Sequence, residues 1–327
     1  MNLLIFEFIC GGGLAKHSLP EHLAAEGRLM LQALLDDLKE LTNIELIIPL
    51  DRRIQRLEIP ACASVIWIDD TTQDDFLSKL IEQVDAVWPI APDSQNILSS
   101  IAELVESQNK TLLLSSAATV RLCSNKLDTI NTLSSQGLAC IPTTSLDQTI
   151  TTVPEKSVIK PTEGISCEGS WIIEPNTNCR QLIHNLDQYI IQPYIEGESL
   201  SLSCLFQQGQ GWLLTINNQL IQARNHSFVF LGCEVNELTQ PRQEFQSLVN
   251  KLAKALPGLW GYVGIDLIKS QNEILIMEIN PRLTTSYAGI KAATGFNVAK
   301  LVLELNQKAP LLEPTHNRTI RITLNEY

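Results

Sequence analysis

Two carboxylates and an amide are the residues of this sequence that most directly suggest chemistry. Asp266 lies in the run GYVGIDLIK (residues 261–269), and Glu278 and Asn280 lie in the run EILIMEINPR (residues 273–282). Both runs alternate apolar residues with others, which predicts two β-strands joined as a hairpin. If the three polar side chains converge, they supply oxygen ligands of the kind that Mg²⁺ prefers, the rest coming from water and phosphate.

The register of this hairpin decides whether the three side chains converge. The apolar residues predicted to face one core are Val263, Ile265, Leu267, Leu275, Met277 and Ile279. A connection with an odd number of residues, such as residues 270–272, puts both acids on the opposite face. An even connection separates them, because a slip of one residue reverses every side chain. The alternative is an ordinary solvated face of an antiparallel hairpin.

Two lysines favour a phosphate ligand. Lys126 begins a predicted helix, where a positive charge is slightly unfavourable. Lys160 ends an apolar strand beside the small-residue loop 162–170. A glycine-containing loop lets backbone N–H groups approach phosphate oxygens, and lysine supplies a positive charge. We therefore expect Lys126 and Lys160 to bind phosphate; the alternative is that both are ordinary structural or surface lysines.

The first 115 residues predict a parallel sheet with helices on its faces, because segments of strand and helix character alternate there. Gly11, Gly12 and Gly13 follow the first strand but lack the last glycine of a dinucleotide-binding loop. That departure argues against a nicotinamide-dependent oxidoreductase. The three glycines remain candidates for a substrate loop, and a plain turn is the alternative.

Composition excludes some classes of partner. The net charge is −12 and the basic residues are scattered, whereas a nucleic-acid binder usually has a basic patch. No apolar run approaches the ~20 residues that span a bilayer, so no membrane partner is expected. The eight cysteines fit neither a zinc site nor a disulfide framework. Free thiols of this kind predict a cytoplasmic location.

Taken together, these residues occur in the order found in a known superfamily. They are Lys126, Lys160 with its glycine loop, the linker at residues 192–198, Asp266, Glu278 and Asn280. Over residues 115–300 the chain resembles the ATP-grasp superfamily of carboxylate–amine ligases. The resemblance implies an α/β fold in three parts: a pre-ATP-grasp domain (1–115), a small lobe with a glycine-rich flap (116–195) and a C-terminal lobe with the metal-binding hairpin (196–327).

The resemblance also implies that ATP lies between the two lobes. Lys126 and Lys160 correspond to the lysines that hold its phosphates. The other implied contacts are Glu163, Gly164 and Ser166 in the flap, Gln192, Tyr194 and Ile195 in the hinge that reads the adenine edge, and Glu198 at the ribose hydroxyls.

Catalytic roles follow from the same resemblance. Asp266, Glu278 and Asn280 correspond to the ligands of two Mg²⁺ (or Mn²⁺) ions. Arg282 and Lys160 are the implied catalytic residues, because they can contact phosphate or an acyl-phosphate intermediate. Further candidates for substrate contacts are Gly11, Gly12, Gly13, Arg224, Thr285 and Ser286.

One position departs from the superfamily pattern. Some relatives carry an arginine two residues before the first metal-binding acid, and this sequence has Gly264 there. Either Arg282 or Arg224 is expected to replace that arginine; the alternative is that the intermediate is stabilised differently.

A more specific resemblance rests on three segments, which are residues 6–13, residues 124–126 and residues 278–287. They are similar to the tyramine–glutamate ligase family of methanofuran biosynthesis and its bacterial relatives in one-carbon metabolism. This implies small-molecule substrates, glutamate and the amine of tyramine or tyrosine, and by family analogy a homodimer. The alternatives are an amino-acid or peptide ligase of other specificity and a non-catalytic ATP-binding module.

Overall fold

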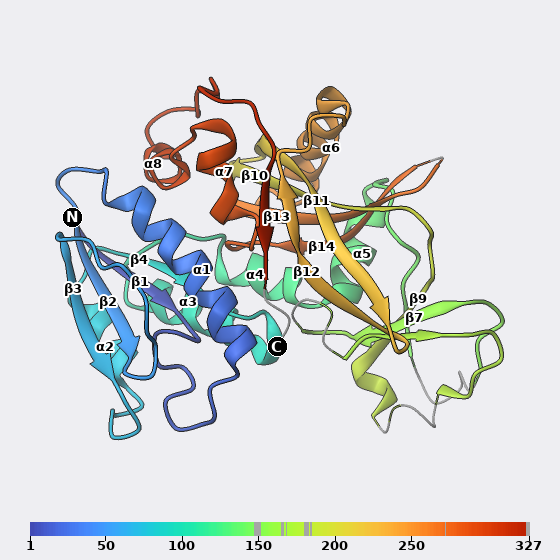
Figure 1. Cartoon of the computed structure of the whole chain (residues 1–327), viewed down its shortest axis with the longest axis horizontal. Coiled ribbons are helices and arrows are strands. Elements are labelled where there is room, and N and C mark those ends of the chain that lie inside the picture. Colours follow the sequence, from blue (N-terminus) through green and yellow to red (C-terminus); the bar gives the residue numbers. More distant parts are fainter. Residues whose placement is uncertain are drawn as a thin grey trace.

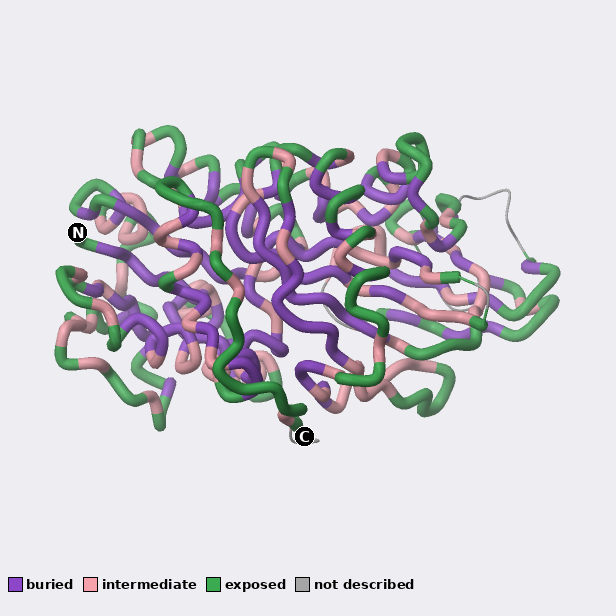
Figure 2. Tube along the Cα trace, turned by 90° about the horizontal axis from the view of Figure 1, so that it is seen from above, coloured by how far each residue is buried: buried purple, intermediate pink, exposed green. Residues whose placement is uncertain are grey.

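The computed structural model describes residues 1–146, 152–164, 167, 169–179, 183, 185–271 and 273–324. The described chain folds around three β-sheets (Figure 1). Buried residues follow the strands through the interior, and exposed residues gather in the outer loops (Figure 2). No helix in the described part of the chain combines the length and apolarity needed to cross a membrane.

The N-terminal part forms the predicted parallel sheet, with strand order β3-β2-β1-β4-β5. Its strands are β1 (Asn2–Glu7), β2 (Glu45–Asp51), β3 (Ala63–Ile68), β4 (Ala86–Ile90) and β5 (Thr111–Leu112). Its helices are α1 (Glu21–Leu38), α2 (Phe76–Glu82) and α3 (Ile97–Ser107), with a short 3₁₀ turn, η1 (Ser94–Asn96), before α3. The order in which strands are added to the sheet reverses between β1 and β4. Ligands of such sheets bind at the carboxyl ends of the strands at this point.

A small antiparallel sheet follows, with strand order β6-β9-β7-β8. Helices α4 (Ala117–Ser124) and α5 (Lys126–Ser135) lead into it. Its strands are β6 (Thr144–Ser145), β7 (Ser157–Pro161), β8 (Trp171–Ile173) and β9 (Tyr189–Pro193), and the 3₁₀ turn η3 (Leu186–Gln188) precedes β9. The short helix predicted at residues 181–185 lies largely outside the described residues.

The third sheet is antiparallel, with strand order β14-β13-β10-β11-β12-β15. Its strands are β10 (Glu198–Gln207), β11 (Gln210–Arg224), β12 (Ser227–Val235), β13 (Gly261–Lys269), β14 (Ile274–Asn280) and β15 (Ile320–Thr323). Helix α6 (Arg242–Ala255) packs on β11, and α7 (Tyr287–Thr294) and α8 (Val298–Glu304) follow the hairpin.

The register of the β13–β14 hairpin corrects one prediction. Lys269 pairs with Ile274, so the connection has an even number of residues, which by itself separates the acids. A β-bulge at Met277 adds one residue to β14 and restores the pairing of Asp266 with Glu278. The expected odd connection is therefore wrong, although the acids do share a face.

The same bulge changes which residues of β14 face the core. Ile276 and Ile279 belong to the buried cluster with Val263, Ile265 and Leu267 of β13. Leu275 and Met277, which were predicted to face that core, are not part of it. Two consecutive residues share a face at a bulge, so the period-two pattern fails there.

The N-terminal sheet and the C-terminal helices share a hydrophobic core. The cluster that contains Leu3 and Ile5 of β1 also contains Ile290 and Val302 of α7 and α8. Helix α1 lies at this junction (Figure 1). Buried polar groups cross the junction as well: the Tyr287 hydroxyl donates to Asp37 at 2.8 Å.

Removal of this hydroxyl is expected to loosen the junction. Tyr287→Phe keeps the ring, which packs edge-to-face on Tyr262, and leaves buried Asp37 without one donor. Hydrogen bonds to charged groups contribute about 1.5–3 kcal/mol, so we expect a clear fall in melting temperature by scanning calorimetry. Tyr189→Phe, on half-buried β9, is the control; an equal effect of both changes contradicts this account.

Candidate active site

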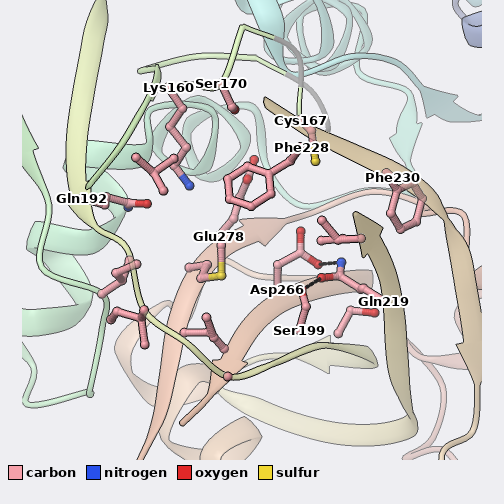
Figure 3. A pocket seen from close by; sticks show the side chains of 18 of the residues that line it. Lys160, Cys167, Ser170, Gln192, Ser199, Gln219, Phe228, Phe230, Asp266 and Glu278 are labelled. Carbon is pink, nitrogen blue, oxygen red and sulfur yellow. Dashed lines mark hydrogen bonds between the residues drawn. The ribbon is translucent and has the colours of Figure 1, made fainter. Parts of the chain in front are cut away.

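A cavity of about 530 Å³ lies between the small sheet and the large antiparallel sheet. Strands β7 and β9 line it on one side, and β10 to β14 line it on the other. Figure 3 shows Lys160, Gln192, Asp266 and Glu278 around this space, although they are far apart in the sequence. Asn280 and Arg282 also line the cavity.

Asp266 lies at the centre of a hydrogen-bond network on the cavity floor. Its two oxygens accept from Asn280 Nδ2 at 3.1 Å and from Gln219 Nε2 at 2.9 Å. The Gln219 carbonyl in turn accepts from the Ser199 hydroxyl at 2.8 Å (Figure 3). This chain of bonds fixes which end of the Gln219 amide faces Asp266. The carboxylate is thereby held in one orientation.

The electrostatics of this floor suit a cation. Burial, together with the charge of Glu278, raises the pKa of Asp266 from 3.8 to about 7. Across the described residues no cluster of three or more His, Cys, Asp or Glu has metal-ligand geometry. Two carboxylates and an amide oxygen are nevertheless enough for a hard cation that takes its other ligands from water and phosphate. The donor set therefore fits Mg²⁺.

The two predicted lysines lie on the same side of the molecule but differ in their contacts. Lys160 lines the cavity, and burial lowers its pKa to about 8. Lys126 is only 4% exposed; its ammonium lies 3.2 Å from a Glu278 oxygen and donates to the Gly164 carbonyl at 3.1 Å. Lys126 thus connects the start of the flap to one of the two acids.

The hinge between the sheets is only partly as predicted. Gln192, Tyr194 and Ile195 line the cavity. The Tyr194 N–H already donates to the Lys156 carbonyl at 2.9 Å. This N–H is therefore occupied, which leaves Ile195 as the better candidate for reading a base edge.

The structure contradicts the position predicted for Glu198. Ser199 and Ser201 of β10 face the cavity, so Glu198 points to the opposite face, because side chains alternate along a strand. There it accepts from Gln240 Nε2 at 2.8 Å. Glu196, which is outside the strand, lines the cavity instead.

Arg282 lines the cavity, whereas Arg224 does not. Arg282 Nε donates to Asp93 Oδ2 at 2.6 Å, and Asp93 follows β4 at the carboxyl edge of the parallel sheet. A side chain at Gly264 would place its Cβ 2.6 Å from Thr284 Cγ2, so this position has no room for an arginine. Of the two arginines predicted to replace it, the geometry favours Arg282.

Other predicted contacts do not reach the cavity. Gly11, Gly12 and Gly13 form a packed turn against Phe6, Phe8 and Ile68 and do not line the cavity, which favours a plain turn over a substrate loop. Glu163 and Gly164 are described but do not line the cavity, and Ser166 lies outside the described residues. Thr285 and Ser286 do line it.

Among the polar lining or supporting residues that were not identified from the sequence are Glu26, Asp93, Glu196 and Gln219. Glu196 carried a visible signal, since it lies two residues from Glu198 in the linker. The other three depend on contacts between segments far apart in the chain. A pattern within one segment could not have found them.

Comparison with known proteins identifies the class of this chain. Residues 123–286 match the family described as ATP-grasp domain, and residues 44–120 match the family described as pre ATP-grasp 3 domain. The chain belongs to the ATP-grasp family, and the predicted α/β fold class is confirmed. It is an ATP-dependent ligase that forms carbon–nitrogen bonds.

Particular relatives extend over nearly the whole chain. The tyramine–L-glutamate ligase of Methanocaldococcus fervens is 29% identical over 92% of this chain and 93% of its own length. A solved ATP-grasp superfamily protein from Archaeoglobus fulgidus has a TM-score of 0.74 at 23% identity, covering 98% of this chain and 91% of that one. Biotin carboxylase from Campylobacter jejuni, solved as a β,γ-ATP complex, has a TM-score of 0.70 at 14% identity over 95% and 71%.

Asp266→Asn tests the electrostatics of the floor. Because the pKa of Asp266 is raised to about 7, its ionisation disfavours the folded state as pH rises from about 4 to 7. The variant cannot ionise. We therefore expect its melting temperature, relative to the wild type and with a chelator present, to increase between pH 5 and pH 8. Exposed Asp70→Asn is the control. A difference that is constant or falls with pH contradicts the account.

Proposed function

We propose that this ligase joins L-glutamate to the amine of tyramine or tyrosine, as a step of methanofuran-type cofactor biosynthesis. The observation that carries the chemistry is the convergence of Asp266, Glu278 and Asn280 with Lys160 in one cavity. The choice of substrates is supported by the match to tyramine–L-glutamate ligase over 92% of the chain.

In the proposed complex the adenine lies at the hinge and the triphosphate extends toward Arg282. Ile195 offers its backbone to the base, and Glu196, rather than Glu198, is the acid available to the ribose. Lys160 holds a phosphate by charge-assisted contact. Asp266, Glu278 and Asn280 hold Mg²⁺ or Mn²⁺, two ions by family resemblance, which neutralise charge on the triphosphate oxygens.

The reaction has two steps. A carboxylate oxygen of glutamate attacks the γ-phosphorus of ATP, the bond to the bridging oxygen breaks, and ADP and an acyl phosphate form. The neutral amine nitrogen then bonds to the acyl carbon, phosphate leaves with the electrons of the carbon–oxygen bond, and the nitrogen loses a proton. Arg282, held by Asp93, faces the transferring phosphoryl group.

Lys126 has a separate proposed role. Its contacts with Glu278 and with the Gly164 carbonyl tie the flap to the cation site. Binding of the nucleotide next to Glu278 and the Gly164 carbonyl favours closure of the flap. The closed flap keeps water from the acyl phosphate. The flap residues 165, 166 and 168 lie outside the described part of the chain.

A cytoplasmic location is part of the proposal. It is supported by the use of ATP and by the eight cysteines, which are free thiols in the described structure. The homodimer expected from the family resemblance is tested by sedimentation equilibrium.

The substrates are tested by ADP release coupled to a dehydrogenase assay, with mass spectrometry of the product. We expect release to require both glutamate and tyramine or tyrosine, and the product to have the mass of the amide. Release with other amino acids but not with glutamate refutes the substrate assignment and leaves the ligase chemistry intact. No amine-dependent release with any pair refutes the proposed function.

The phosphate role of Lys160 is tested by Lys160→Met, which removes one buried cation from the cavity. Loss of one preorganised charged contact at a reacting phosphate costs roughly 10²–10³-fold in rate. We expect a fall of that order in kcat/KM for ATP. Lys79→Met on exposed α2 is the matched control. Wild-type kinetics in Lys160→Met exclude Lys160 from the nucleotide site.

A further inference from the structure

Among the described residues that line the cavity, Glu26 is the one contributed by the N-terminal α/β part. It lies on α1, which packs between the parallel sheet and the C-terminal helices. Its carboxylate accepts a hydrogen bond from the Thr285 hydroxyl, and Thr285 is itself a buried lining residue. Glu26 therefore reaches the cavity from the side opposite the small sheet.

This position is at the end of the cavity away from the hinge. Residues 192–197 and 199 line the hinge end, where Ser199 pairs with Ile268. Farther along the same strands Gly264 pairs with Asn280, and Arg282, Thr285 and Glu26 line the cavity beyond that pair. The carboxylates Asp266 and Glu278 pair with each other between these two positions along the strands. A nucleotide bound with its base at the hinge thus directs its terminal phosphate toward the end that contains Glu26.

Glu26 forms no salt bridge with a described residue, although its charge helps to raise the pKa of Arg282. Arg282, the cation at this end, is paired with Asp93 at 2.6 Å. Within the described chain Glu26 has a hydroxyl donor and no ion-pair partner. A half-buried carboxylate with one neutral donor retains acceptor capacity, and a cation satisfies it better than water does.

The substrates differ in charge, and this difference decides which of them suits Glu26. At neutral pH ATP is an anion, glutamate is a zwitterion with a net negative charge, and an aliphatic primary amine is a cation. A carboxylate at this end repels ATP and the carboxylates of glutamate, and it attracts most strongly the substrate whose net charge is positive. We propose that Glu26, supported by Thr285, forms the subsite that binds the acceptor amine as its ammonium ion, before the nitrogen loses the proton that leaves it neutral for attack. This subsite rests on the proposed ligase function and deepens it.

Glu26→Gln tests the subsite, because it keeps the shape and removes the charge. Glu21→Gln, on the same helix and exposed, is the matched control. Two acceptors are compared: tyramine, which is cationic at pH 7.5, and hydroxylamine, which is uncharged and converts the acyl phosphate to a hydroxamate. The loss of one charge-assisted contact predicts about a 10- to 100-fold fall in kcat/KM for tyramine. With hydroxylamine the fall is expected to be several times smaller.

Equal losses with tyramine and hydroxylamine overturn the subsite, because they place Glu26 in the activation of the donor or in folding. Unchanged kcat/KM for tyramine overturns it as well. Glu26→Asp, which keeps the charge, should recover part of the tyramine activity. If it is no better than Glu26→Gln, the charge is not what the amine recognises.

A binding measurement keeps the test independent of turnover. Calorimetry with tyramine, in the presence of a non-hydrolysable ATP analogue, is expected to give about tenfold weaker binding to Glu26→Gln than to the wild type. Wild-type protein that binds tyramine but releases no ADP with glutamate refutes the proposed donor and retains the subsite. Equal binding by both proteins, or none by the wild type, refutes the subsite.

Discussion

The two neighbouring carboxylates Asp266 and Glu278 impose the main constraint on this structure. Like charges placed together in a buried cavity disfavour the folded state unless cations or hydrogen-bond donors surround them. The side-chain amides of Gln219 and Asn280 donate to Asp266, and the Lys126 ammonium forms an ion pair with Glu278. These donors come from strands β11 and β14 and from the start of helix α5. The site consequently depends on more than one lobe of the fold.

The N-terminal α/β part takes part in the chemistry through its edges. Asp93 follows β4, where the strand order of the parallel sheet reverses, and it accepts a hydrogen bond from Arg282. Helix α1 carries Asp37 and Glu26. Asp37 accepts a hydrogen bond from the Tyr287 hydroxyl, and Glu26 accepts one from the Thr285 hydroxyl. These contacts join residues separated by more than half of the chain, and of these residues Glu26, Arg282 and Thr285 line the cavity. The domain boundaries at residues 115/116 and 195/196 stay predictions.

Local patterns predicted much of the fold and part of the site. Alternation of strands and helices was enough for the parallel sheet, and period-two alternation was enough for the β13–β14 pair. The shared face of Asp266 and Glu278 was predicted for the wrong reason, because a bulge leaves no signature in the apolar pattern. Glu198 was misplaced because the strand begins with it and the facing of its side chain was not considered. Asp93 and Glu26 depend on tertiary contacts that no local pattern encodes.

The bulge at Met277 has a consequence for comparing this chain with its relatives. The length of the β13–β14 connection and the extra residue in β14 compensate for each other. A relative that is one residue longer in the connection and has no bulge therefore keeps the same pairing of acids. An alignment that introduces a single gap in this region, without a second one at the bulge, will equate residues from opposite faces of the sheet.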